Sequence, residues 1–300
     1  GVMDRIGLGS DVLRKINPKL VYVAVSGFGK EGPMANKPAF DHVIQGMSGL
    51  TNLQSPEDNG FDHIRTFICD KVTSYTVCQA ATAALVARAT TGEGQHIDIS
   101  MLHACLAFMW PDGMMHRTLK DDDRFEMSPG ADYFQTLNFS DGAVAVAALT
   151  DNHWKALLPL IGYPELLHTP LFSSIASRMS NMKEVGKVLK NPRLDIGVEK
   201  AVAALKAADV PCAPCLHQDE IEANEQIQAI DALETYVTQA MGKLTVPRPP
   251  VQFDGATTSQ AEPSPLLGEH SREVLSELGW DHSSIDQLID SGAVVITALP

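Results

Sequence analysis

The order of apolar and polar residues predicts alternating strands and helices. Residues 20–25 form an apolar run after a turn signal, which is typical of a buried strand, and the alternating residues 95–100 predict a second one. Residues 71–90 contain no proline or glycine and are rich in alanine, so we expect a long helix that ends near Gly92. Another buried helix is expected over residues 101–110. The fold class predicted from this order is α/β.

The second half of the chain begins with a change in composition. Residues 116–132 are charged and rich in turn formers, which indicates a linker. A turn, a strand and a helix are then expected within residues 138–162. Four further helices are expected, over residues 182–189, 197–208, 269–280 and 283–292, with an extended proline-rich segment over residues 245–253.

Composition and charge narrow the classes of partner. The formal net charge of −14 argues against a nucleic-acid partner, because phosphate binding needs a positive surface. No apolar run is long enough to predict a membrane span, and the first residues do not resemble a signal peptide. The five cysteines are an odd number, which disfavours a disulfide framework and favours the reducing cytoplasm.

Two short motifs have ordinary structural explanations. Gly27, Gly29 and Gly32 match the dinucleotide-binding pattern, but Pro33 and Pro38 oppose the helix that this pattern needs. An NAD-linked oxidoreductase therefore stays an alternative, and a glycine-rich loop without NAD is preferred. The C-x-x-C motif of residues 212–215 has no second pair to complete a zinc site and is interpreted as a short proline-bracketed strand, so no metal is expected.

Asp70 is an acid with two competing interpretations. It lies within "TFICDKVTSY", after an apolar run and directly before the predicted long helix. One interpretation is the N-cap of that helix, since aspartate is a favoured cap. The other is a nucleophile, because a helix N-terminus keeps a carboxylate ionised and an ionised, water-shielded carboxylate can attack a thioester. Spacing alone leaves both interpretations open.

Five segments in order resemble the class III CoA-transferase family, the CaiB/BaiF-like acyl-CoA transferases, over nearly the whole chain. They are "GVMDRIGLG", "NPKLVYVAVSGFGKEGP", "FDHVIQGMSGL", "TGEGQHIDISML" and "PLLGEHSREVLSELGW". The resemblance implies a Rossmann-like large domain over residues 1–125, a smaller α/β domain over residues 126–212, and a return to the large domain over residues 213–300. It also implies an interlocked homodimer and a further N-terminal segment that precedes "GVMDR" in family members.

The resemblance further implies an enzyme that moves CoA from an acyl-CoA donor to a carboxylic acid acceptor. Asp70 takes the place of the catalytic aspartate, which passes through a mixed anhydride and an aspartyl-CoA thioester. Arg5 takes a CoA-contacting position, and Ala39, Phe40 and Asp41 line the cleft for CoA and the reacting groups. For Asp41, a simpler alternative is the N-cap of its own helix. The cofactor is coenzyme A, present as the acyl-CoA substrate, and the route needs neither metal nor ATP.

Two alternatives within this resemblance remain. An α-methylacyl-CoA racemase uses a histidine where this chain has Phe40, and phenylalanine cannot carry a proton, so racemase is the weaker reading. A catalytically silent CoA-binding fragment is the other. Formyl-CoA transferase carries a run of four glycines in its small domain, and none occurs between Arg124 and Asn138, so formyl and oxalate specificity is not supported.

Overall fold

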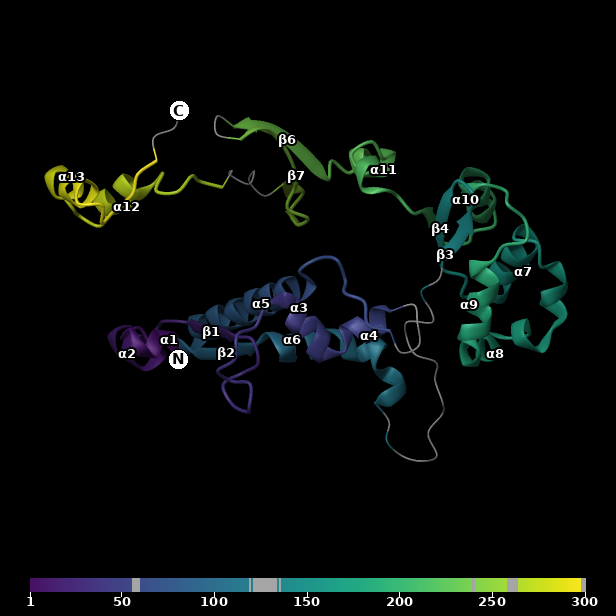
Figure 1. Ribbon diagram of the computed structural model, residues 1–300, viewed down its shortest axis with the longest axis horizontal. Helices are drawn as coiled ribbons and strands as arrows, with labels where there is room; N and C mark the ends of the chain where they lie inside the picture. Colours follow the sequence, from purple (N-terminus) through teal and green to yellow (C-terminus); the bar gives the residue numbers. More distant parts are fainter. Residues whose placement is uncertain are drawn as a thin grey trace. The chain divides into compact units, whose positions relative to one another are not determined.

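The computed structural model describes residues 1–55, 60–118, 120, 134, 136–238, 241–257 and 264–297 (Figure 1). The chain divides into two compact units, Gly1–Cys215 and Leu216–Pro300, and each is described by itself. Most of the predicted linker, and most of the segment between Arg124 and Asn138, lie outside the described residues. The three domain boundaries expected from the resemblance stay predictions.

The first unit opens with two short helices and a pair of parallel strands. Helices α1 (Val2–Arg5) and α2 (Ser10–Ile16) precede β1 (Tyr22–Ser26), which pairs in parallel with β2 (His96–Ser100). Parallel strands need a long crossover, and here it contains α3 (Asp41–Ser48), α4 (Leu50–Gln54) and α5 (Ile68–Thr91) (Figure 1). Both strands predicted from the sequence are confirmed, and so is the mixed α/β class.

Helix α5 is the long alanine-rich helix, and its end matches the prediction. Gly92 closes it in the left-handed conformation with φ of 79°, which glycine adopts without strain. Its beginning differs, because the helix starts at Ile68 and the N-cap position belongs to Phe67, whose side chain makes no capping bond. Of the two interpretations of Asp70, the N-cap is therefore wrong, since Asp70 lies inside the first helical turn.

A small apolar core fixes the first turn of α5 against its neighbours. Helix α6 (Met101–Gly113) follows β2 and packs along α5, and α3 packs against both. The buried side chains of this core come from all of these helices: Ile44, Leu50, Cys69, Cys105 and Met109. Partly buried residues such as Phe28 and Ala39 pack against the same cluster. The beginnings of α3 and α5 are thus held to one core.

The loop after β1 does not begin a helix at its glycines. Gly29 and Gly32 have positive φ angles of 99° and 91°, and the next helix starts only at Asp41. A pyrophosphate site of the dinucleotide type needs helix N-terminal amides at this point. The interpretation of this motif as a glycine-rich loop is confirmed.

A second, larger core lies in the later part of the same unit. Strands β3 (Thr136–Phe139), β4 (Gly142–Val146) and β5 (Cys212–Pro214) form an antiparallel sheet in that order. The C-x-x-C segment is the edge strand β5, as predicted. The short turn η1 (Met115–Arg117) follows α6. Helices α9 (Met182–Lys190) and α10 (Val198–Ala207) contact the sheet. The other elements of this part are α7 (Asp151–Leu160), η3 (Pro164–His168), η4 (Pro170–Phe172) and α8 (Ile175–Ser180). Within the described ranges, no three or more His, Cys, Asp or Glu side chains are grouped to hold a metal ion.

The second unit consists of a hairpin, small turns and two terminal helices. Its elements are η5 (Gln218–Glu220), α11 (Glu225–Ala229), the antiparallel pair β6 (Leu233–Thr238) and β7 (Gly242–Pro247), the short pair β8 (Gln252–Phe253) and β9 (Ala256–Thr257), α12 (Ser271–Glu277) and α13 (His282–Asp290). Both terminal helices and the extended proline-rich segment agree with the sequence. None of the helices in the described part of the chain is long and apolar enough to cross a bilayer.

Candidate functional site

Asp70 lies at the third position of α5 with its side chain exposed. Among the described residues, its carboxylate makes no hydrogen bond and no ion pair. An acid in the first turn of a helix is stabilised by the helix dipole. Yet this carboxylate is open to solvent and uncommitted, which is what a group that attacks a substrate requires.

The backbone donors at the start of α5 are all occupied. The first four N–H groups of a helix have no partner within it. In α5 the Ile68 N–H donates to the carbonyl of Thr66 at 2.8 Å, and the Lys71 N–H donates to the carbonyl of Phe67 at 3.2 Å. The remaining two, from Cys69 and Asp70, donate to one carboxylate oxygen of Asp41 at 2.7 and 3.0 Å. None of these four amides is therefore free to bind a substrate.

Asp41 caps the N-terminus of α5, although it lies 28 residues before Cys69 in the chain. Its side chain is only 2% exposed. It is the first residue of α3, but the N-cap position of α3 belongs to Phe40, and no side chain caps that helix. The expectation that Asp41 caps its own helix is therefore wrong, because its Oδ2 accepts from the first turn of α5 instead. A carboxylate at a helix N-terminus also complements the dipole of that helix.

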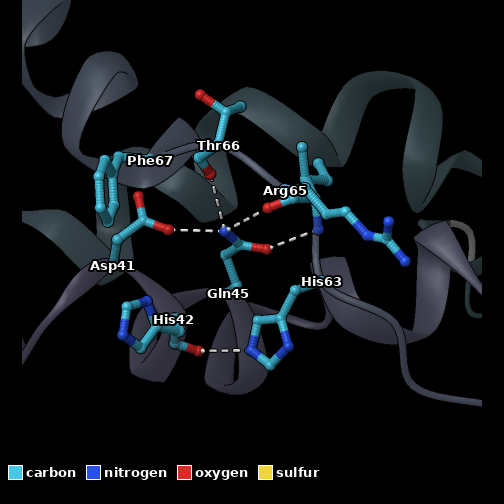
Figure 2. A pocket seen from close by; sticks show the side chains of 8 residues that line it. Asp41, His42, Gln45, His63, Arg65, Thr66 and Phe67 are labelled. Carbon is cyan, nitrogen blue, oxygen red and sulfur yellow. Dashed lines mark hydrogen bonds between the residues drawn. The ribbon is translucent and has the colours of Figure 1, made fainter.

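Gln45 holds Asp41 in place. One helical turn after Asp41, it is also 2% exposed, and its Nε2 donates to Asp41 Oδ1 at 2.6 Å. The same amide nitrogen lies 3.2 Å from the carbonyl oxygens of Ile64 and Thr66, and Gln45 Oε1 accepts the Ile64 N–H at 3.0 Å (Figure 2). Gln45 thus joins α3 to the segment that leads into α5.

A cavity of about 380 Å³ opens beside this network. In Figure 2 the rings of His42 and Phe67 both lie to the left of Gln45, and the His63 ring lies below it. The rings of His42 and Phe67 are stacked with centroids 6.3 Å apart, and His63 Nε2 lies 3.3 Å from the carbonyl oxygen of His42. The full lining is Asp41, His42, Gln45, His63, Ile64, Arg65, Thr66 and Phe67. Asp70 does not line this cavity, although its N–H is bound by a residue that does.

Cys69 is the other potential nucleophile in the first turn of α5. It is fully buried and shares a hydrogen bond with the equally buried Cys105. That bond, together with burial, raises the pKa of the Cys69 thiol well above its ordinary value. The thiol therefore stays protonated at neutral pH and belongs to the core.

The other residues expected at the site lie in two places. Ala39 packs on the core beneath α3, and Phe40 follows it with 71% of its surface exposed. Both lie directly before Asp41 in the chain, and Asp41 bonds to the first turn of α5, so they share the region where α5 begins. Arg5 does not, because α1 lies near the opposite end of α5 (Figure 1). A direct contact of Arg5, Ala39, Phe40 or Asp41 with CoA stays a prediction.

Gln45 is the residue that sequence reasoning missed. The available signal was its spacing, since an acid and an amide four positions apart on a helix share one face. What the spacing does not reveal is the partner of that face, the segment from Ile64 to Thr66.

Comparison with known proteins decides the family. The sequence profile described as "CoA-transferase family III" matches residues 1–271. The chain belongs to CoA-transferase family III. The expected resemblance is confirmed, and the chain is an enzyme of the CoA-transferase class.

Named relatives and solved structures agree with this placement. The chain is 27% identical to the mouse succinyl-CoA:glutarate CoA-transferase over 98% of its own length and 68% of the mouse protein. It is 31% identical to the acetyl-CoA:oxalate CoA-transferase of Acetobacter aceti over 92% of its length and 71% of that protein. A CAIB/BAIF family protein from Brucella suis has a similar structure, with a TM-score of 0.72 and 28% identity over 93% of this chain and 73% of that one. Rv3272 from Mycobacterium tuberculosis shares the fold, with a TM-score of 0.74 and 24% identity over 91% of this chain and 73% of that one.

Proposed function

We propose that this family III chain transfers CoA from an acyl-CoA thioester to a carboxylic acid, with Asp70 as the nucleophile. The observation that carries this role is the contrast between two acids at the start of α5. Asp41 is buried and bonded to the helix amides, whereas the carboxylate of Asp70 is exposed and makes no bond within the described part of the chain. Only the second is available to form a covalent bond with a substrate.

The proposed reaction conserves bonds and charge at each step. A carboxylate oxygen of Asp70 attacks the acyl carbon, the carbon–sulfur bond breaks, and CoA leaves as a thiolate from a mixed anhydride. The thiolate then attacks the aspartyl carbonyl, which releases the donor acid and leaves an aspartyl-CoA thioester. The acceptor carboxylate repeats these steps in reverse, so that Asp70 is regenerated and the new acyl-CoA departs. Neither proton nor electron is gained or lost.

This route requires water to be excluded, because an anhydride and a thioester both hydrolyse. It also requires a group that holds CoA. The guanidinium of Arg5 suits phosphate oxygens, and Ala39 and Phe40 would flank the acyl end of the cofactor. The N–H groups of Cys69 and Asp70 already donate to Asp41. Other hydrogen-bond donors would therefore have to stabilise the oxyanion of the tetrahedral intermediate.

The acids to be tested come from the names of the relatives. Those names include succinyl-CoA with glutarate and acetyl-CoA with oxalate. We propose a short dicarboxylic acid as acceptor and give glutarate priority, since the sequence does not support oxalate specificity. Succinyl-CoA and acetyl-CoA are the first donors to try.

The racemase alternative makes a different use of the same acid. It needs a proton carrier opposite Asp70, and Phe40 supplies none. Exchange of the α-hydrogen of 2-methylacyl-CoA in deuterated water, without any acceptor acid, would favour racemase over transfer.

The direct test of the proposed function is a substitution at Asp70. We expect Asp70→Ala to lower the rate of CoA transfer by about a thousandfold or more, because no other group takes over the covalent step. The new acyl-CoA is measured by liquid chromatography. Circular dichroism checks that α5 is retained, which is expected because the side chain of Asp70 makes no bond to any residue that the structure describes. Full turnover in this variant would remove the mechanism.

A further inference from the structure

We propose that Asp41 and Gln45 are positioning residues that keep the carboxylate of Asp70 from capping its own helix. This inference rests on the proposed function, since it explains how the nucleophile stays available. It assigns to Asp41 a role through Asp70 rather than a contact with CoA.

The position of Asp70 in α5 is one at which acids normally serve as caps. An acidic side chain in the first turn of a helix lies close to the backbone N–H groups of that turn, which have no partner within the helix. It is attracted there by the unpaired donors and by the helix dipole. Asp70 occupies this position, yet its carboxylate makes no such bond among the described residues.

Asp41 occupies two of the backbone N–H groups to which the carboxylate of Asp70 could otherwise bind. Its Oδ2 accepts the N–H groups of both Cys69 and Asp70, at 2.7 and 3.0 Å. Ile68 and Lys71 donate to backbone carbonyls, so each of the four amides from Ile68 to Lys71 has a partner. A single buried carboxylate thus provides both the hydrogen bonds and the negative charge that the helix end attracts.

Asp281, a capping carboxylate elsewhere in the chain, shows how capping changes the pKa of an aspartate. Asp281 caps α13, where its Oδ1 accepts the Ser284 N–H at 3.0 Å. The backbone hydrogen bond from Ser284 lowers the pKa of Asp281. A carboxylate stabilised in this way is a weaker base and a weaker nucleophile, and its oxygens point at the helix. Asp70 keeps both oxygens free because Asp41 takes the capping position.

Gln45 determines which way the capping carboxylate faces. Its Nε2 donates to Asp41 Oδ1 at 2.6 Å, which leaves Oδ2 for the helix. Its Oε1 accepts the Ile64 N–H, so the orientation of the amide is fixed by its neighbours (Figure 2). Glutamate has nearly the same shape but no N–H donor. It would set a second carboxylate against Asp41 and against the carbonyls of Ile64 and Thr66.

The experiment compares Asp41→Ala, Asp41→Asn and Gln45→Glu with the unaltered chain. In each, kcat and KM for succinyl-CoA are measured with glutarate as acceptor, together with the melting temperature. We expect kcat to fall by about a hundredfold in Asp41→Ala and by about tenfold in the other two, with KM changed by less than about twofold. Asparagine keeps one acceptor oxygen, so partial rescue relative to alanine is the expected signature of positioning.

Asp281→Ala is the matched control, because it removes a capping carboxylate from a helix that carries no nucleophile. It should lower the melting temperature and leave kcat unchanged. Asp41→Asn and Gln45→Glu keep the inference testable if Asp41→Ala does not fold.

The outcomes separate the inference from the proposed function. If Asp70→Ala is inactive while Asp41→Asn and Gln45→Glu keep the original kcat, the positioning role is overturned and the nucleophile stands. If KM for acyl-CoA rises in Asp41→Asn while kcat is unchanged, Asp41 contacts CoA instead, which also overturns the inference. Full turnover in Asp70→Ala removes the proposed function itself.

Discussion

At the scale of single residues, the site depends on two acids whose surroundings are opposite. Asp41 is buried and bonded by three donors, whereas Asp70 is exposed and bonded by none among the described residues. A buried carboxylate needs such donors because its desolvation is costly. An exposed one needs none and stays available to substrate. Their chemical type is the same, so their different roles come from the structure around them.

The adjacent thiol provides a test at this scale. Because Cys69 and Cys105 are both fully buried, and the pKa of the Cys69 thiol is also raised, we expect iodoacetamide at neutral pH to leave both of these thiols unmodified in the folded chain. The exposed Cys78 and Cys215 should react. Peptide mass spectrometry reads out each site, and a sample denatured in urea is the control in which all react. Early labelling of Cys69 in the native state would contradict its place in the core.

At the scale of elements, the junction between α3 and α5 is the feature that the sequence did not predict. Both parallel strands, the length of α5 and its end at Gly92 follow from local patterns. The start of α5 does not, because its capping group lies 28 residues away in the chain from Cys69. Local rules assign the nearest acid as the cap, which is Asp70, whereas tertiary packing brings Asp41 there. For the same reason Gln45 had no visible partner in the sequence.

The loop that leads into α3 can be tested through Gly27. A Cβ atom at Gly27 would lie 2.2 Å from the Cβ of Ala39, so one of the two segments would have to move. We expect Gly27→Ala to lower the free energy of unfolding by about 1–3 kcal/mol, the usual cost of overpacking. Urea denaturation measures this.

The double variant Gly27→Ala with Ala39→Gly is the control for that contact. It removes the opposing methyl group, so most of the lost stability should return. Equal loss in the single and double variants would show that Gly27 and Ala39 do not pack as described.

At the scale of the whole molecule, membership of CoA-transferase family III connects the fold with the expected assembly. The resemblance predicted the α/β class and the CoA-transferase family, and both are confirmed.

We expect the chain to form an interlocked homodimer. If the chains thread through one another, the dimer dissociates only on unfolding, and the melting temperature should rise with protein concentration. Light scattering coupled to size exclusion gives the mass, and differential scanning calorimetry at several concentrations gives the transition. A monomeric mass at all concentrations, with a constant melting temperature, would contradict this assembly.

The central claim is that Asp70 forms a covalent bond during transfer. The chain is incubated with succinyl-CoA, quenched with hydroxylamine, and digested for peptide mass spectrometry. Hydroxylamine converts an aspartyl thioester or anhydride into a hydroxamate, and we expect this change at Asp70 only when acyl-CoA is present. A hydroxamate at another residue, or none at Asp70 while turnover proceeds, would contradict the account.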